Sequence, residues 1–152
     1  MKRDFVQLAI AFFALAIGGA VEEFVPKFYG VGFPVLLSAA AYMAVRRTPL
    51  SGVLFAVAAG AAEDAISGLP PMTSIAWFVA VASLMRGFKL PLPIAAFAFC
   101  GYQVWLWAWM GSDLGGRLAG RILAALPSGA LALFATAGVL CLMDREGAVE
   151  EK

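Results

Sequence analysis

The chain has 152 residues, of which 62% are hydrophobic and only 14% are charged. Eleven basic residues nearly balance ten acidic ones, and the net charge of +1 provides no general attraction to nucleic acid. This composition excludes an ordinary soluble domain, and the length accommodates at most six or seven short-looped membrane spans with no separate domain beside them.

Residues that commonly carry catalysis or bind metals are scarce. Histidine is absent, and the two cysteines, Cys100 and Cys141, both fall inside apolar segments without a Cys-x-x-Cys motif. Histidine is the commonest metal ligand and the usual general base. We therefore expect no metal, no cofactor and no enzymatic activity.

Charged residues and Pro/Gly clusters divide the chain into six apolar segments, which predict a single all-α integral membrane domain of about six transmembrane helices. The segments are residues 5–21, 29–45, 50–66, 72–85, 90–110 and 122–143, and a short charged tail follows at 144–152. The fourth segment is shorter than the roughly 17 residues of a full crossing, so it is tilted, embedded among other helices or re-entrant. Because the connections are short, consecutive helices should be antiparallel neighbours.

The basic residues predict the orientation, because lysine and arginine favour cytoplasmic loops. In a six-span arrangement eight of them fall on one side: Lys2, Arg3, Arg46, Arg47, Arg86, Lys89, Arg145 and Lys152. Three fall on the other side: Lys27, Arg117 and Arg121. This asymmetry predicts a multi-pass membrane protein with both termini in the cytoplasm.

The second segment carries Pro34 near its start, shortly after Gly30 and Gly32. Proline removes a backbone donor and restricts the preceding residue, so the first turn should be irregular or kinked. A plain helix start accounts for Pro34 equally well.

The third segment contains a stripe of small residues at a spacing of four, which places them on one helix face. The stripe consists of Gly52, Ala56, Gly60, Asp64 and Gly68. Such a face lets another helix or a partner approach closely. Asp64 lies on this face, whereas Glu63 points about 100° away from it.

Asp64 has two interpretations. A charged residue at membrane depth costs roughly 2.5–3.5 kcal/mol on insertion scales, so the carboxylate needs a partner, a wet cavity or an interfacial position. It is either an interfacial acid that pairs with a loop residue or with Arg117 or Arg121, or a group that holds a partner or shapes a cavity. Arg121 has its own alternative, which is to extend toward the interface from the start of the sixth segment.

Aromatic residues gather near the outer end of the fifth segment, at Tyr102, Trp105, Trp107 and Trp109. Such belts anchor helices at the lipid–water boundary. Tyr102, Trp105 and Trp109 also share one stripe, which suits them to protein docking, since tryptophan and tyrosine are favoured interface anchors.

Several features between Phe33 and Met85 occur together. A proline opens the second span (Pro34), a run of small and aliphatic residues ends at Tyr42 and the pair Arg46–Arg47, and a small-residue helix follows with Gly60, Asp64 and Gly68. Pro127 in the first part of the last span and Arg145 at the cytoplasmic end of that span add to the pattern. The chain thereby resembles the MreD family of bacterial rod-shape-determining membrane proteins, although Leu69-Pro70-Pro71-Met72-Thr73 replaces a glycine pair that often follows the acidic motif.

The resemblance implies a non-enzymatic scaffold of the cell-wall elongation machinery in the bacterial cytoplasmic (inner) membrane. Its implied partners are MreC, the MreB filament, and the glycosyltransferase and transpeptidase that build the lateral cell wall.

Two alternatives remain open. A substrate-binding membrane subunit of an energy-coupling-factor-type vitamin transporter also has about six short-looped spans, but it needs convergent polar groups, and the sequence offers few: Gln103, Tyr102, Ser74 and Thr73. A proton-coupled transporter that uses Glu63 or Asp64 would lack an internal repeat and a histidine relay.

Overall fold

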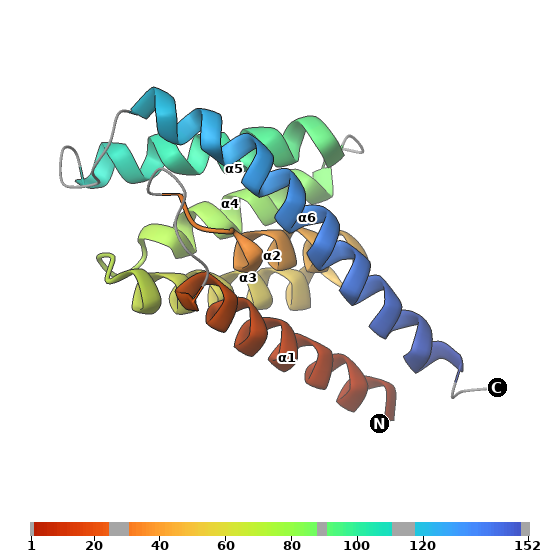
Figure 1. The fold of residues 1–152 in the computed structure, drawn as a ribbon. Coiled ribbons are helices and arrows are strands. Elements are labelled where there is room, and N and C mark those ends of the chain that lie inside the picture. The colour runs from red at the N-terminus through yellow and green to blue at the C-terminus, as the bar shows by residue number, and fades with distance from the viewer. Residues whose placement is uncertain (1, 25–30, 88–90, 111–117, 150–152) are drawn as a thin grey trace.

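The computed structural model describes residues 2–24, 31–87, 91–110 and 118–149, and in these ranges the chain forms a bundle of six helices. They are α1 (Lys2–Phe24), α2 (Val35–Arg46), α3 (Pro49–Ser67), α4 (Thr73–Gly87), α5 (Pro91–Met110) and α6 (Leu118–Val149). Odd-numbered helices run in one direction and even-numbered helices in the other, so that both termini lie at the same end of the bundle (Figure 1). The predicted all-α helical bundle is confirmed.

Helix length and hydropathy mark the chain as a multi-pass membrane protein. Val6–Phe24, Pro49–Ser67 and Leu118–Met143 are each long and apolar enough to cross a bilayer, and α2 and α4 are shorter apolar helices. Large apolar side chains such as Phe12, Leu123 and Phe134, each 69% exposed, cover the outside of the bundle. A soluble protein rarely exposes so much contiguous apolar surface, whereas lipid solvates it well.

Helix α2 lies in the middle of the bundle, where it contacts α1, α3, α4 and α6. Its side chains are buried around most of the helix circumference, as expected for a helix without a polar face. Its neighbours therefore cover it along most of its 12 residues. The other short helix, α4, is likewise embedded against α2, α3 and α5.

The start of α2 differs from the start of the second apolar segment. Residues 31–34 are not helical, and the helix begins at Val35 with Pro34 as its N-cap. A residue that precedes proline is driven away from the α region, which prevents the helix from including Phe33. Residues 29 and 30 of the predicted segment lie outside the described part of the chain.

Helix α6 is longer than the last apolar segment, and it includes Pro127 in its interior. It begins at Leu118 and continues to Val149, so most of the charged tail at 144–152 extends the helix.

Glycines set the closest helix contacts. A Cβ atom on Gly60 would lie 2.6 Å from the Cα atom of Ile75, so α3 and α4 touch through their backbones. At Gly52 the corresponding distance to the Cα atom of Ala44 on α2 is 3.0 Å. The glycine stripe predicted on α3 therefore packs against helices of the same chain.

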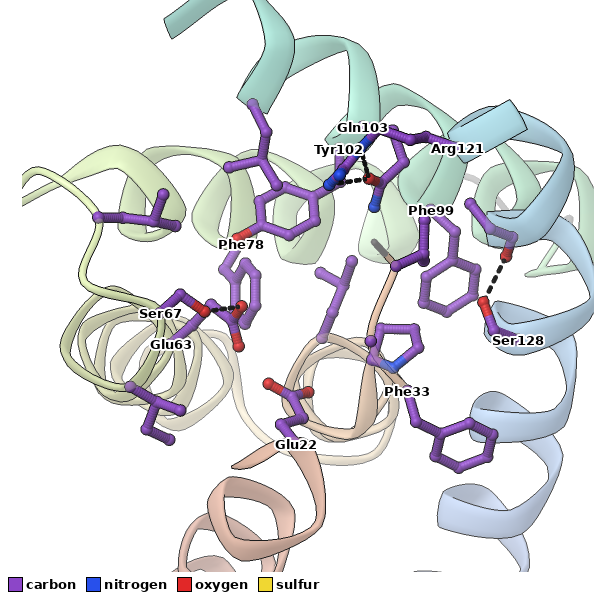
Figure 2. A pocket seen from close by; sticks show the side chains of 18 of the residues that line it. Glu22, Phe33, Glu63, Ser67, Phe78, Phe99, Tyr102, Gln103, Arg121 and Ser128 are labelled. Carbon is purple, nitrogen blue, oxygen red and sulfur yellow. Dashed lines mark hydrogen bonds between the residues drawn. The ribbon is translucent and has the colours of Figure 1, made fainter. Parts of the chain in front are cut away.

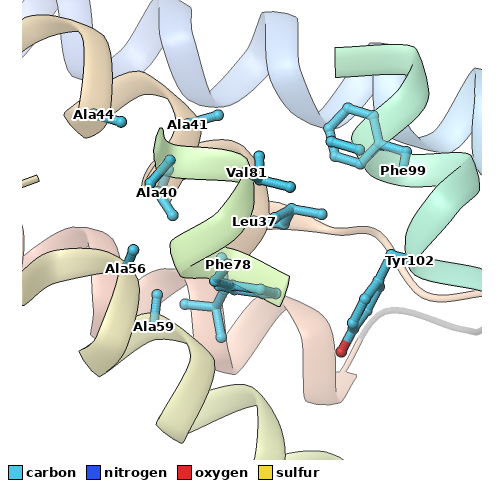
Figure 3. Close-up of a cluster of buried hydrophobic side chains, with 14 of the residues drawn as sticks. Leu37, Ala40, Ala41, Ala44, Ala56, Ala59, Phe78, Val81, Phe99 and Tyr102 are labelled. Atoms are coloured by element: carbon cyan, nitrogen blue, oxygen red, sulfur yellow. The ribbon is translucent and has the colours of Figure 1, made fainter. Parts of the chain in front are cut away.

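The core between these helices is built largely from alanine and a few large side chains (Figure 3). Ala40 and Ala44 of α2 face Ala56 and Ala59 of α3, and Phe78 fills the space beside them. Small residues on both sides let α2 and α3 approach each other closely.

Candidate functional site

Asp64 on α3 caps the start of the next helix. Its side chain is 6% exposed, and its Oδ1 atom accepts a 2.7 Å hydrogen bond from the backbone N–H of Ser74 in the first turn of α4. The first N–H groups of a helix lack intrahelical partners, and the positive end of the helix dipole favours an anion there. Asp64 therefore joins α3 to α4.

The turn between α3 and α4 is tight. Gly68 adopts a left-handed conformation with φ of 63° and ends α3, and the backbone N–H of Leu69 donates to the Asp64 carbonyl at 3.0 Å. Met72 also has a positive φ of 75°, which is costly for a residue with a side chain. The Leu69–Thr73 segment, where the sequence departs from the MreD pattern, therefore forms a compact corner between α3 and α4, next to Asp64.

Glu22 on α1 caps the start of α2, as Asp64 on α3 caps the start of α4. Its Oε1 atom accepts a 2.7 Å hydrogen bond from the backbone N–H of Leu36 in the first turn of α2, and the side chain is 9% exposed. The N-cap residue Pro34 provides no side-chain hydrogen bond of its own. At both corners an acid from an odd-numbered helix thus supports the start of the following even-numbered helix.

A cavity of about 370 Å³ opens beside these corners (Figure 2). Its lining comes mainly from the ends of α1, α3 and α5, the segment that enters α2, and the first turns of α6, with Leu37 of α2 and Phe78 of α4 between them. Because odd-numbered helices end where even-numbered helices begin, these parts all meet at the end of the bundle opposite the two termini. The polar side chains that line the cavity are Glu22, Glu23, Glu63, Ser67, Tyr102, Gln103, Arg121 and Ser128.

One wall of the cavity is acidic. The carboxyl groups of Glu22 and Glu63 interact electrostatically although they come from different helices, and both point into the cavity (Figure 2). The hydroxyl of Ser67 donates to Glu63 Oε1 at 2.9 Å. Glu63 Oε2 is buried and accepts no hydrogen bond from the part of the chain that the structure describes.

A basic group lies on a different wall. Arg121 on α6 is 4% exposed, and its Nε and Nη2 atoms donate to Gln103 Oε1 on α5 at 3.2 and 3.0 Å. One interpretation of the sequence makes Arg121 the counter-ion of Asp64, but in the structure Asp64 accepts a hydrogen bond from Ser74 of α4, and Arg121 donates to Gln103. Arg117, the other candidate partner, lies outside the described residues.

The aromatic stripe of α5 divides into a buried and an exposed part. Tyr102 is 6% exposed, and its hydroxyl lies 2.6 Å from that of Ser74, while the indole N–H of Trp105 donates to the Thr73 carbonyl at 2.9 Å. Trp109 is 59% exposed. Tyr102 and Trp105 thus hold α5 against the first turn of α4, and Trp109 is available at the bundle surface.

Glu22 is the site residue that sequence reasoning missed. It falls in the break after the segment at residues 5–21, where the adjacent acid Glu23 and the nearby Pro26 are typical of a loop. A second pair of adjacent acids, Glu63 and Asp64, occurs at the corresponding end of α3. That recurrence before each embedded helix was the available signal.

No protein-family model matches the chain, and no curated protein and no solved structure shows significant similarity to it. Function is therefore inferred from the chain's own residues and from their resemblance to the MreD family.

Proposed function

We propose that the protein is a non-enzymatic scaffold subunit of the bacterial cell-wall elongation machinery, similar in role to MreD. The observation that carries the proposal is that Gly60, Asp64 and Gly68, which define the resemblance on α3, act together at one corner. Gly60 admits α4, Asp64 caps it, and Gly68 makes the turn between the two helices. The motif thus specifies a particular helix junction, which supports a common ancestry better than shared composition does.

We further propose that both termini are cytoplasmic and that the cavity faces the outer side of the membrane. Arg46, Arg47 and Arg86 gather at the end of the bundle that carries the termini, where Arg86 Nη1 donates to the carbonyls of Ala44 and Arg47. Basic residues favour the cytoplasmic side. In this orientation the arginine end approaches the MreB filament, and the end with Trp109 approaches MreC and the cell-wall synthases.

One observation favours a second candidate, the substrate-binding subunit of a vitamin transporter. Glu22, Glu63 and Arg121 join Tyr102 and Gln103 around the cavity, so the convergent polar groups that such a subunit needs are more numerous than the sequence alone indicated.

Depletion of the protein from a rod-shaped host distinguishes the two candidates. A scaffold of lateral wall synthesis should yield round cells with unchanged vitamin uptake, and crosslinking in native membranes should recover MreC with the protein. Cell width by microscopy and uptake of radiolabelled vitamins are the measurements. Rod-shaped depleted cells with impaired uptake of one vitamin would refute the scaffold and establish the transporter subunit.

A further inference from the structure

We propose that the cavity between α1, α3, α5 and α6 binds a small organic cation, with its ammonium group held between Glu22 and Glu63. The proposal does not depend on the scaffold function, because a scaffold and a transporter subunit can each bind a ligand at this position. Three features of the cavity support it: the charge of its acidic wall, its volume and its aromatic lining.

Two carboxyl groups face one another across the cavity (Figure 2). Glu22 and Glu63 come from helices far apart in sequence, yet they interact with one another inside an apolar bundle. Two carboxylates at close range repel one another, and each is costly at membrane depth. A cation between them offsets both costs, and it provides the partner that Glu63 Oε2 lacks among the described residues.

The size of the cavity selects an organic ion. About 370 Å³ lies within the range of small-molecule pockets and greatly exceeds the space of a dehydrated metal ion. No cluster of three or more metal-ligating side chains occurs in the part of the chain that the structure describes. A metal would therefore have too few protein ligands here, whereas an ammonium group needs only charge and hydrogen-bond acceptors.

The lining fits an ammonium group that is attached to carbon. Phe33, Phe78, Phe99 and Tyr102 surround the cavity together with the two acids. Aromatic rings attract cations through their faces, and carboxylates beside aromatic rings are a common means of binding ammonium groups. Arg121, on a different wall, repels a cation, so it directs the positive end of the ligand toward Glu22 and Glu63.

Choline and its uncharged isostere test the proposal. The full chain, purified in discs of phosphatidylglycerol, should bind choline or benzyltrimethylammonium saturably and melt at a higher temperature in their presence. The neutral alcohol 3,3-dimethylbutan-1-ol has the shape of choline without the charge, and it should do neither. Isothermal titration calorimetry and thermal unfolding are the two measurements.

Variants assign the binding to the acidic wall. Glu63→Gln should weaken choline binding about tenfold or more, equivalent to about 1.4 kcal/mol, while the fold persists because Glu63 caps no helix. Glu22→Gln should weaken binding similarly, but it also perturbs the cap on α2, so Glu63→Gln is the decisive variant. Glu146→Gln, which removes the same charge near the far end of α6, at the end of the bundle that carries the termini, is the matched control and should change the affinity less than about twofold because the charge is distant and screened.

Equal binding of choline and the alcohol would overturn the proposal, as would unchanged choline affinity in Glu63→Gln or the absence of saturable binding by both ammonium probes. An infrared band of a protonated carboxylic acid that vanishes in Glu63→Gln and persists with choline present would also overturn it, because the two acids would then share a proton. Discs that contain phosphatidylethanolamine identify the source of the ammonium group. If this lipid competes with choline, the site binds a lipid headgroup. If it does not compete, the site binds a free molecule.

Discussion

Gly60→Leu should destabilise the bundle by about 3 kcal/mol or more, because overpacked cores typically lose about 1–3 kcal/mol and here the obstacle is backbone. A Cβ atom at this position would lie 2.6 Å from the Cα atom of Ile75 and 2.7 Å from its nitrogen, so no side-chain rotation relieves the clash. Helices α3 and α4 would have to separate, which would also pull Ser74 away from Asp64. Thermal unfolding of the purified variant and its amount in the membrane measure the effect.

Gly138→Leu is the matched control, since an atom added at Gly138 on α6 meets nothing within 4 Å. Leucine is the better helix former by up to about 1 kcal/mol, so this variant should be as stable as the original chain or slightly more stable. Similar losses at Gly60 and Gly138 would show that α3 and α4 do not pack through their backbones.

Asp64→Ala should cost about 2 kcal/mol, because hydrogen bonds to charged groups contribute about 1.5–3 kcal/mol and the variant leaves the Ser74 N–H at the start of α4 without its partner. Glu63→Ala should have a much smaller effect on stability, since Glu63 caps no helix and its carboxyl is bonded to Ser67 of the same helix. Asp64→Asn should be intermediate, because the amide oxygen still accepts the hydrogen bond without the charge. Thermal unfolding of the three variants gives the order directly.

The amount of partner recovered with each variant distinguishes a loss of folding from a loss of partner binding. If Asp64 acts through the fold, Asp64→Ala should lose membrane protein and partner together, in proportion to one another. Equal melting temperatures for Asp64→Ala and Glu63→Ala would contradict the capping role. Normal amounts of Asp64→Ala with normal partner recovery would leave Asp64 as an acid of no special importance.

The helical segments were predictable from the sequence because lipid imposes a simple requirement. A backbone in hydrocarbon must satisfy its own hydrogen bonds, so long apolar segments between charges and prolines become helices. The same requirement does not determine which helix lies at the centre of the bundle. Helix α2 is as apolar as its neighbours, and only the burial of most of its residues distinguishes it.

The candidate site was only partly predictable, because its contacts join residues that are distant in sequence. The spacing of Gly60 and Asp64 correctly indicated close helix approach, but spacing within one helix does not reveal that the approaching helix is α4. Arg121 and Gln103 belong to different helices and form no local pattern. Glu22 was obscured by a proline four residues later, although α1 in fact continues to Phe24.

Alkaline phosphatase fusions test most directly the central claim, which is a six-span bundle with cytoplasmic termini and a charged cavity at the outer face. The enzyme is active only outside the cytoplasm, so fusions after Lys27 and Ser112 report on the connections at the cavity end, and a fusion after Lys152 reports on the C-terminus. We expect the first two fusions to be active and the third to be inactive. An active fusion after Lys152, or inactive fusions after Lys27 and Ser112, would contradict it.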